Sequence, residues 1–433
     1  MRADDLPLPV PKSRAEVERI QRARKRNAVE HALRSPFWRP KLAGIRLDRL
    51  DDPAEWRKIP ILEKDVLRKL TSEQFYTEFC IGPQNEICEY WRSGGSTGKP
   101  LFYPRTYEDI RHCMVGFART FECSGTKAGN VAHNSFPLGI HPAGHMWARA
   151  ARLMGIGTAW AGSGASLPSA AQLELIQALK PTLWMGMSSY GLHLANLAEA
   201  RGIDLAGGSV KRVLCTAEPV SQAKREKIER EWGAEMFDCF GMTECTMMGA
   251  ESAAHDGFHI WTDLAFIEVL DEKTYEPVPE GTPGLLVVTS LFTNNATPFL
   301  RWNAGDIVVY KGEGAADSPY SVFPVLRHAH RTAGFFKVRG VNINHQEFED
   351  FLFGHVAVAD FKAEIIATHG LDGLRVSIEL KRGAGSETTI QELVGRVKAT
   401  FEVTPEIVVL ETGTLAREFE GSVKAPRFAD RRE

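Results

Sequence analysis

The sequence has no hydrophobic run long enough to cross a bilayer, and its first residues, Met1–Pro11, are polar and proline-rich rather than apolar like a signal peptide. It also lacks repeats, low-complexity tracts and a long linker. The formal net charge is only −3 over 433 residues. A charge so close to balance argues against nucleic acid and against an anionic membrane surface as partners.

Cysteine is sparse. The seven cysteines are dispersed, their number is odd, and no two form a C-x-x-C pair. This usage is typical of the reducing cytoplasm and argues against a disulfide framework. Cys215 and Cys239 lie at the ends of apolar, strand-like runs, so we interpret them as small core residues rather than nucleophiles. The chain is therefore predicted to be cytoplasmic.

What the chain does have is the patterning of a globular protein, with 43% hydrophobic and 25% charged residues. Helical and strand-like segments alternate up to about residue 328, which indicates mixed α/β layers. A smaller α/β pattern follows, with a hairpin across residues 370–373 and an apolar helix face after it. We expect a large mixed α/β domain over residues 1–329, a small C-terminal α/β domain over 330–433, and a hinge near His330–Gly334.

The octapeptide SGGSTGKP, residues 93–100, is the most informative stretch. Alternating runs on both sides indicate a tight loop between paired strands. Its glycines, hydroxyls and single lysine would let backbone N–H groups close around a polyphosphate. It does not match G-x-x-x-x-G-K-[ST], since Ser93 and Pro100 stand at the first and last positions of that pattern. A flexible loop with one lysine is the alternative.

Four stretches further along could serve the same nucleotide. The run Phe240–Glu244, at the end of a short strand, offers an aromatic ring, a hydroxyl and a carboxylate. Asp306 at a turn could accept from both ribose hydroxyls. Residues 331–349 form a basic strand-turn-helix stretch, and residues 420–427 place a lysine on a glycine-bearing loop. Each is weak alone, but their order and spacing together are informative.

In this order the stretches resemble the adenylate-forming superfamily of acyl-CoA ligases and carrier-loading enzymes, and more narrowly its phenylacetate–CoA ligase group. The resemblance covers nearly the whole chain, from Ser35–Arg39 and Ile59–Asp65 to Lys424–Arg427. It implies a large adenylating domain, a small mobile C-terminal domain, and use of ATP, Mg²⁺ and coenzyme A. The implied reaction joins a carboxylate to the α-phosphate of ATP and then passes the acyl group to CoA.

The resemblance also implies roles for individual residues. Lys424, Thr243 and Glu244 would be catalytic, with Glu244 holding Mg²⁺. Phosphate contacts would come from Ser93, Ser96, Thr97, Gly98 and Lys99. Adenine and ribose contacts would come from Ala217, Glu218, Pro219, Phe240, Gly241, Asp306 and Arg331. Arg339 and Gly340 would receive the pantetheine of CoA.

Two features depart from the family pattern. Ala333 and Gly334 stand where family hinges usually carry an acidic residue or lysine. Some relatives bind a structural zinc through cysteines, but here only His259 of that set remains, beside Ser252, Arg327 and Ala329. Zinc is therefore not expected, although His255, His328 and His330 lie nearby in the sequence and leave an improvised metal site open.

The acid is the hardest part to predict. Phe136, Ala217 and Met242 would line its pocket and favour an aromatic or other hydrophobic acid. No Asp occurs between Val131 and Met146 to meet a substrate ammonium, which argues against an α-amino acid. The alternatives are a carrier protein, an amine or another nucleophile as acceptor, a regulatory module that binds nucleotide without turnover, and an unrelated phosphate-loop hydrolase. The oligomeric state stays open, with a homodimer as one possibility.

Overall fold

The computed structural model describes residues 6–92, 101–312, 318, 320–331, 335–339, 341–368, 371–384, 386–421 and 426–432. The predicted phosphate loop at 93–100 lies outside these residues, as do Gly340, Lys424 and most of the predicted hinge, residues 332–334.

The chain forms two compact units, and each is made of segments that are distant in the sequence. The first unit comprises residues 1–130, 138–158 and 237–332, and the second comprises 131–137, 159–236 and 333–433. The division into domains over residues 1–329 and 330–433 stays a prediction.

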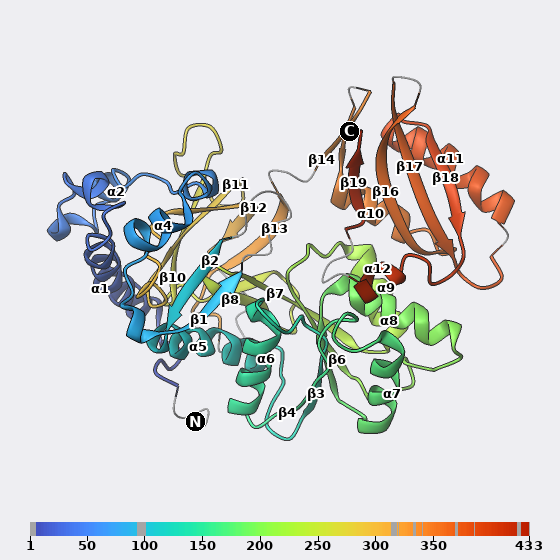
Figure 1. Cartoon of the computed structure of the whole chain (residues 1–433), viewed down its shortest axis with the longest axis horizontal. Helices are drawn as coiled ribbons and strands as arrows, with labels where there is room; N and C mark the ends of the chain where they lie inside the picture. The colour runs from blue at the N-terminus through green and yellow to red at the C-terminus, as the bar shows by residue number, and fades with distance from the viewer. Residues whose placement is uncertain are drawn as a thin grey trace. The chain divides into compact units, whose positions relative to one another are not determined.

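In the first unit, antiparallel strands form one large sheet region (Figure 1). Neighbouring strands follow the order β10 (Ala265–Leu270), β11 (Pro283–Ser290), β12 (Trp302–Lys311), β13 (Val325–Arg331), β9 (Phe258–Ile260), β8 (Thr246–Glu251) and β7 (Glu235–Met242). The boundary at which the chain returns from the second unit to the first, between Met236 and Phe237, falls within β7. Leu286, Val288 and Ile260 are among the buried residues of the core formed on these strands.

A hairpin and two helices complete the part of this unit that matters for the site. Strands β1 (Ile87–Arg92) and β2 (Phe102–Thr106) pair antiparallel, so the predicted paired strands around residues 93–100 are present. Helix α5 (Tyr107–Cys123) begins at Thr106, which forms a capping box with Asp109. Gly116 of α5 lies so close to β8 that a Cβ there would be 2.3 Å from the Met247 carbonyl oxygen. Helix α6 (Pro142–Leu153) packs on α5.

The remaining helices of the first unit are mostly short. Helix α1 (Arg14–Ala32) begins at Ser13, whose side chain accepts from the Glu16 backbone N–H. The others are η2 (Arg39–Leu42), η3 (Leu47–Arg49), α2 (Pro53–Trp56), α3 (Lys64–Arg68), α4 (Ser72–Gln74), the π-helical turn η4 (Phe75–Phe79) and η5 (Gln84–Glu86).

The second unit combines parallel strands with helices. Its strands follow the order β6 (Arg212–Cys215), β5 (Leu183–Gly186), β3 (Val131–Asn134) and β4 (Gly157–Trp160), and β5 pairs in parallel with both β6 and β3. Its helices in this part are α7 (Ser169–Leu179), α8 (Ser188–Ala200) and α9 (Gln222–Trp232). Helix α9 is capped by Ser221, whose side chain accepts from the Lys224 backbone N–H.

The C-terminal part of the second unit begins with the hairpin β14 (Phe335–Val338) and β15 (Val341–Asn344), followed by α10 (His345–Phe353). A separate sheet has the order β18 (Pro405–Leu410), β17 (Leu371–Leu380), β16 (Val358–Thr368) and β19 (Phe428–Arg431). In the sequence, α11 (Ser386–Phe401) stands between β17 and β18, and α12 (Arg417–Gly421) stands between β18 and β19. The predicted hairpin is β16–β17. Residue Asp350 of α10 caps α9 by accepting from the Ala223 backbone N–H at 2.9 Å.

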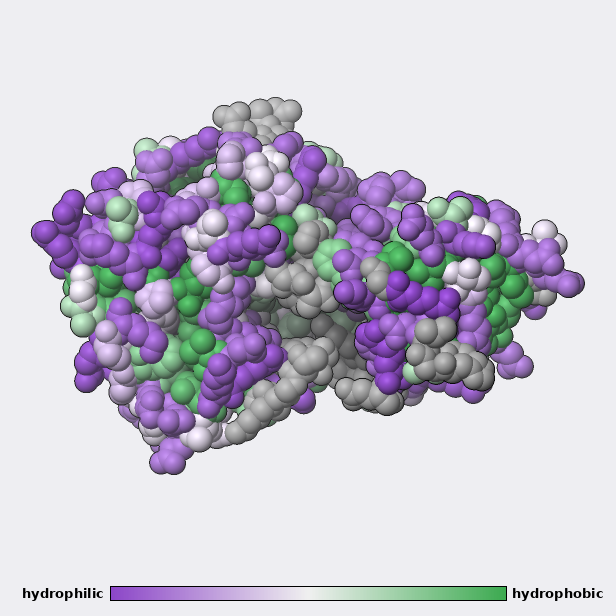
Figure 2. All heavy atoms as spheres, turned by 90° about the horizontal axis from the view of Figure 1, so that it is seen from above, coloured by the Kyte–Doolittle hydropathy of each residue, from purple (hydrophilic) through white to green (hydrophobic). Residues whose placement is uncertain are grey.

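Hydrophilic residues cover much of the face drawn in Figure 2, and the apolar residues visible there form small separate patches. Of the helices that the structure describes, none combines the length and the apolar composition that crossing a membrane requires.

Candidate functional site

The predicted motif Phe240–Glu244 lies at the turn that joins β7 to β8. The strand pairing contains a bulge between Phe240 and Gly241. A Cβ at Gly241 would lie 2.6 Å from the Thr246 carbonyl oxygen, so the turn requires glycine there. Phe240 is half-buried, and its ring stacks on Phe258 with centroids 5.4 Å apart. The motif is therefore a tight, bulged turn, and Phe258 packs against one face of the Phe240 ring.

The carboxylate of Glu244 is held by a residue of β2. The Tyr103 hydroxyl donates to Glu244 Oε1 at 2.9 Å. Tyr103 is fully buried, whereas Glu244 keeps 6% of its surface exposed. Within the described ranges, no group donates a hydrogen bond to the other carboxylate oxygen, Oε2. Tyr103 thus holds one oxygen of this carboxylate, and the described residues donate no hydrogen bond to the other.

The backbone of the same turn is held by Arg105, two residues further along β2. Its Nη2 donates to the carbonyl oxygens of Thr243 at 2.6 Å and Glu244 at 2.8 Å. Its Nη1 donates to the Thr293 carbonyl oxygen at 2.9 Å and to Thr297 Oγ1 at 3.2 Å. The guanidinium also lies 4.8 Å from the centre of the Trp91 ring, a cation–π contact. Sequence reasoning missed both Tyr103 and Arg105, and position on the strand after the octapeptide was the only signal.

The two residues predicted to hold the ribose are brought together by strand register. Asp306 on β12 and Arg331 on β13 are direct cross-strand partners. Asp306 is buried, and His328 Nε2 lies 3.2 Å from its Oδ1. The sequence suggested His328 only as part of an improvised metal site, whereas the structure places it against the predicted ribose carboxylate.

The other histidines of the possible metal site have nearby partners. His259 Nε2 lies 3.2 Å from Ser252 Oγ, and burial lowers the pKa of His259. His255 Nδ1 lies 3.4 Å from Glu251 Oε2. In the part of the chain that the structure describes, no group of three or more His, Cys, Asp or Glu residues could hold a metal ion.

In the second unit, the predicted adenine-lining stretch Ala217–Pro219 follows β6. Ala217 is exposed and has a φ of 74°, a left-handed conformation that non-glycine residues rarely adopt. The Glu218 carboxylate accepts from Ser188 Oγ at 3.0 Å and from the backbone N–H and Oγ of Ser189 at 3.0 and 2.7 Å. Lys224 Nζ lies 3.9 Å from it. The side chain of Glu218 is therefore committed to the start of α8 and to α9.

The predicted substrate-pocket and CoA residues have different environments. Phe136 is fully buried in the second unit, Ala217 is exposed, and Met242 in the first unit is half-buried. His133, near Phe136, lies 3.0 Å through Nε2 from Gln172 Oε1, and burial lowers its pKa. Arg339 occupies the β14–β15 turn with a φ of 50°, and its Nε donates to the Asp372 carbonyl oxygen at 2.7 Å. None of these observations tests the predicted roles.

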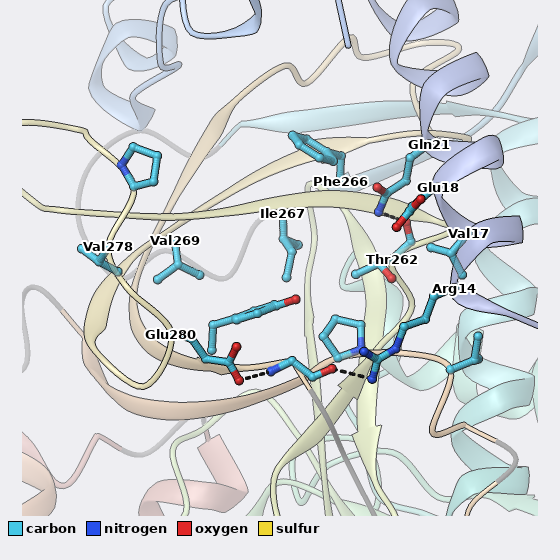
Figure 3. A pocket seen from close by; sticks show the side chains of 15 residues that line it. Arg14, Val17, Glu18, Gln21, Thr262, Phe266, Ile267, Val269, Val278 and Glu280 are labelled. Carbon is cyan, nitrogen blue, oxygen red and sulfur yellow. Dashed lines mark hydrogen bonds between the residues drawn. The ribbon is translucent and has the colours of Figure 1, made fainter. Parts of the chain in front are cut away.

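A cavity of about 570 Å³ lies elsewhere in the first unit, between α1, β10 and the segments around Pro277 and Pro324 (Figure 3). At its edge, Arg14 donates to the Gly312 carbonyl oxygen at 2.7 Å, and the Gly312 N–H donates to Glu280 at 2.6 Å. None of the predicted site residues lines this cavity.

Comparison with known proteins decides which family these features belong to. The sequence model described as "AMP-binding enzyme" matches residues 73–293, just over half of the chain. The chain belongs to the AMP-binding enzyme family. The match includes the octapeptide, β2 and the motif Phe240–Glu244.

Full-length relatives agree with this assignment. The chain is 28% identical over 434 residues to the phenylacetate-coenzyme A ligase of Aromatoleum evansii, covering 97% of this chain and 96% of that protein. It is 27% identical to the phenylacetate-coenzyme A ligase of Escherichia coli (strain K12), covering 93% and 92%. A crystal structure of 2-hydroxyisobutyryl-CoA ligase in complex with 2-HIB-AMP matches with a TM-score of 0.85 at 23% identity, covering 98% of this chain and 94% of that one.

These findings confirm three predictions. The fold is that of the adenylate-forming enzymes, the recognised family is correct, and the enzyme class is an AMP-forming acid–CoA ligase that uses ATP.

Proposed function

We propose that the acid is aromatic, an aryl or arylalkanoic carboxylic acid, and that the enzyme converts it to an acyl-adenylate before transfer to CoA. The observation that carries this proposal is the similarity over nearly the whole chain to proteins named phenylacetate-coenzyme A ligase. The sequence between Val131 and Met146 supports it, since this stretch contains Phe136 and no Asp that could meet an α-ammonium group.

In the first half-reaction, a carboxylate oxygen of the acid forms a bond to the α-phosphorus of ATP, and the bond to pyrophosphate breaks. Two anions must approach each other, so the enzyme has to offset negative charge before and during the attack. We assign the orienting cation to Lys424 and contact with the α-phosphate to Thr243. The leaving pyrophosphate would be held by Ser93, Ser96, Thr97, Gly98 and Lys99.

The carboxylate of Glu244 fits a Mg²⁺ ligand. Proteins usually bind Mg²⁺ with one or two carboxylates while substrate phosphates and water fill the other positions. Glu244 is buried except for a small exposed fraction, and Tyr103 occupies only one of its oxygens. Bound Mg²⁺ would supply charge neutralisation at the phosphate oxygens.

The remaining nucleotide contacts are assigned to three groups. Phe240, which already stacks on Phe258, would present its other face to adenine, together with Gly241. Asp306 and Arg331 would hold the ribose hydroxyls, which the cross-strand register of β12 and β13 supports. Ala217, Glu218 and Pro219 would line the base through their backbone and apolar atoms, because the Glu218 carboxylate already accepts three hydrogen bonds.

In the second half-reaction, the thiol of CoA would attack the acyl carbon and release AMP, with Arg339 and Gly340 receiving the pantetheine. A carrier protein or an amine is the alternative acceptor. Phe136 and Met242 would line the acid pocket.

A product assay by mass spectrometry tests the proposal. The protein is incubated with ATP and Mg²⁺ and a panel of benzoate, phenylacetate, hydroxylated derivatives and short aliphatic acids, with and without CoA. An aromatic acyl-CoA together with AMP is the expected result. An acyl-CoA formed only from aliphatic acids would contradict the proposed substrate class. AMP or acyl-adenylate from an aromatic acid with CoA unconsumed would instead favour another acceptor.

A further inference from the structure

We infer that Tyr103 and Arg105 of β2 are positioning residues for adenylation, which together hold Glu244 so that its Oε2 faces the Mg²⁺ of Mg·ATP. The inference rests on the proposed role of Glu244. Neither residue is placed in contact with substrate, and both act through the turn at Thr243 and Glu244.

Tyr103 selects which carboxylate oxygen is available. A phenolic hydroxyl donates only one hydrogen bond, and here that bond goes to Glu244 Oε1 at 2.9 Å. Because Tyr103 is fully buried, its ring packs against Phe75 and Phe299 and keeps the hydroxyl in place. The carboxylate is thereby held in one orientation, which leaves Oε2 for the cation. Removing a partner that orients a metal ligand in this way typically weakens metal affinity about tenfold to a hundredfold.

Arg105 fixes the backbone that carries this carboxylate. It lies on the same side of β2 as Tyr103, since side chains two residues apart on a strand share a face. It is fully buried, and among the described residues no carboxylate forms an ion pair with it. Its two Nη atoms bond four oxygens, of which two are the carbonyls of Thr243 and Glu244. Charge-assisted hydrogen bonds of this kind are short and strong, so they hold the turn closely.

Strand β2, which carries Tyr103 and Arg105, follows the octapeptide in the sequence. The strand begins at Phe102, soon after residues 93–100 in the sequence, and it pairs with β1, which ends at Arg92. The strand that ends the proposed phosphate-binding loop is therefore also the strand that holds the proposed metal ligand.

The test uses Tyr103→Phe, with Tyr76→Phe as the matched control. Tyr76 also donates one hydroxyl hydrogen bond, to the Phe102 carbonyl oxygen at 3.1 Å, but it is 41% exposed and does not touch Glu244. Calorimetry measures Mg²⁺ affinity in the presence of ATP, and ATP affinity in EDTA. We expect Tyr103→Phe to weaken Mg²⁺ binding about tenfold, with ATP affinity in EDTA unchanged. Tyr76→Phe should change neither affinity.

Equal Mg²⁺ affinity in Tyr103→Phe and wild type would overturn the inference, as would an equal loss of ATP affinity in EDTA. Glu244→Gln separates this failure from failure of the proposed function. If Glu244→Gln weakens Mg²⁺ binding and Tyr103→Phe does not, only the positioning role is lost. If Glu244→Gln also leaves Mg²⁺ binding unchanged, the assigned role of Glu244 is wrong. Arg105→Lys keeps the charge but not the forked geometry, and we expect it to slow adenylation about tenfold without slowing CoA attack on supplied acyl-adenylate.

Discussion

Two glutamates differ in how the protein hydrogen-bonds their carboxylates: Glu244 in the first unit and Glu218 in the second. The sequence assigns both to the same nucleotide. From the residues that the structure describes, the Glu244 carboxylate receives one hydrogen bond, donated by Tyr103 to Oε1. Glu218 receives three, from Ser188 and Ser189, and lies near the Lys224 ammonium. A carboxylate saturated by protein donors has little capacity left for a ligand. The hydrogen bonds of Glu218 hold the loop on which it stands, and the proposed role of Glu244 as a cation ligand rests on the carboxylate oxygen that Tyr103 does not contact.

The two units also bury cations differently. Among the described residues, Arg105 in the first unit donates to four oxygens, all of them uncharged. Lys224 in the second unit lies between two carboxylates, 3.1 Å from Glu349 and 3.9 Å from Glu218. The first arrangement fixes a backbone turn, and the second joins α9 to α10. We therefore expect substitution of Arg105 to change catalysis and substitution of Lys224 to change stability.

Lys424→Ala gives the largest expected effect, because it removes the chemistry that both glutamates are proposed to serve. Acyl-adenylate formation should fall roughly a hundredfold to a thousandfold, since a transition-state contact is lost. ATP binding should stay largely intact. Pyrophosphate exchange and calorimetry measure the two quantities, with the exposed Lys398→Ala as control. Near-normal adenylation would refute the assignment of the catalytic lysine.

Lys224→Met tests whether the second unit depends on its buried cation. Both carboxylates would then lack this partner, and breaking a buried pair typically costs about 3–5 kcal/mol of unfolding free energy. Arg427 stays near Glu349, at 3.8 Å, so we expect a loss at the lower end of that range. Urea unfolding followed by tryptophan fluorescence measures it, with Lys211→Met, an exposed lysine, as control. A loss no greater than that of the control would contradict the prediction.

Glu244→Gln sharpens the contrast between the two carboxylates. Tyr103 can still donate to the amide oxygen, so the fold should be preserved while the negative charge is lost. We expect Mg²⁺ affinity in the presence of ATP to fall about tenfold to a hundredfold. Calorimetric titration with Mg²⁺ measures this affinity, and an unchanged value would remove Glu244 from the metal site.

Glu218→Gln is the matched substitution in the second unit. The amide accepts less well from the donors of Ser188 and Ser189, and Lys224 loses one of its two carboxylates. We expect a loss of about 1–2 kcal/mol in unfolding free energy with Mg²⁺ affinity unchanged. A Mg²⁺ effect as large as that of Glu244→Gln would break the comparison.

The last expected effect is a pH dependence in the second unit. Lys227 donates to the carbonyl oxygens of Val358 at 2.8 Å and Ala359 at 2.5 Å, and burial lowers its pKa to about 7. Between pH 7 and the ordinary lysine pKa of 10.5 the unfolded chain binds more protons than the folded one, so stability should rise with pH. This rise is at most about 1.4 kcal/mol per pH unit.

Urea unfolding at several pH values from 6 to about 9 measures that slope. Below pH 7 both states carry the proton, and Lys227 should contribute no slope. In Lys227→Met the contribution should disappear, whereas Lys211→Met should keep it. Equal slopes in wild type and Lys227→Met would show that the lysine does not titrate in this window.

Much of the fold could be predicted from the sequence because its signals are local. Hydrophobic periodicity predicted the alternation of helices and strands up to about residue 328 and the β16–β17 hairpin with a helix after it. The turn at Phe240–Glu244 was also expected at a strand end. Its support was not, because Tyr103 and Glu244 are 141 positions apart and their contact exists only after the sheet has formed.

The same reason explains the other residues that sequence reasoning missed or interpreted differently. His328 was considered with the histidines near it in sequence, but its partner Asp306 lies across a strand pair with a bulge. Glu218 was assigned to the adenine pocket from its neighbours in the motif, whereas its hydrogen bonds come from the start of α8. Hydrogen-bond partners depend on strand register and helix placement, which single-residue patterns do not encode.

The contacts from β2 to the turn at Thr243 and Glu244 have a consequence for recombination between homologues. A crossover anywhere from Tyr107 to Met242 would take the strand from one parent and the turn from the other. Such a chimera could inherit an intact octapeptide and an intact FGMTE motif and still separate the hydroxyl from its carboxylate. We therefore expect exchange to preserve these contacts when both segments come from the same parent, although they are distant in the gene.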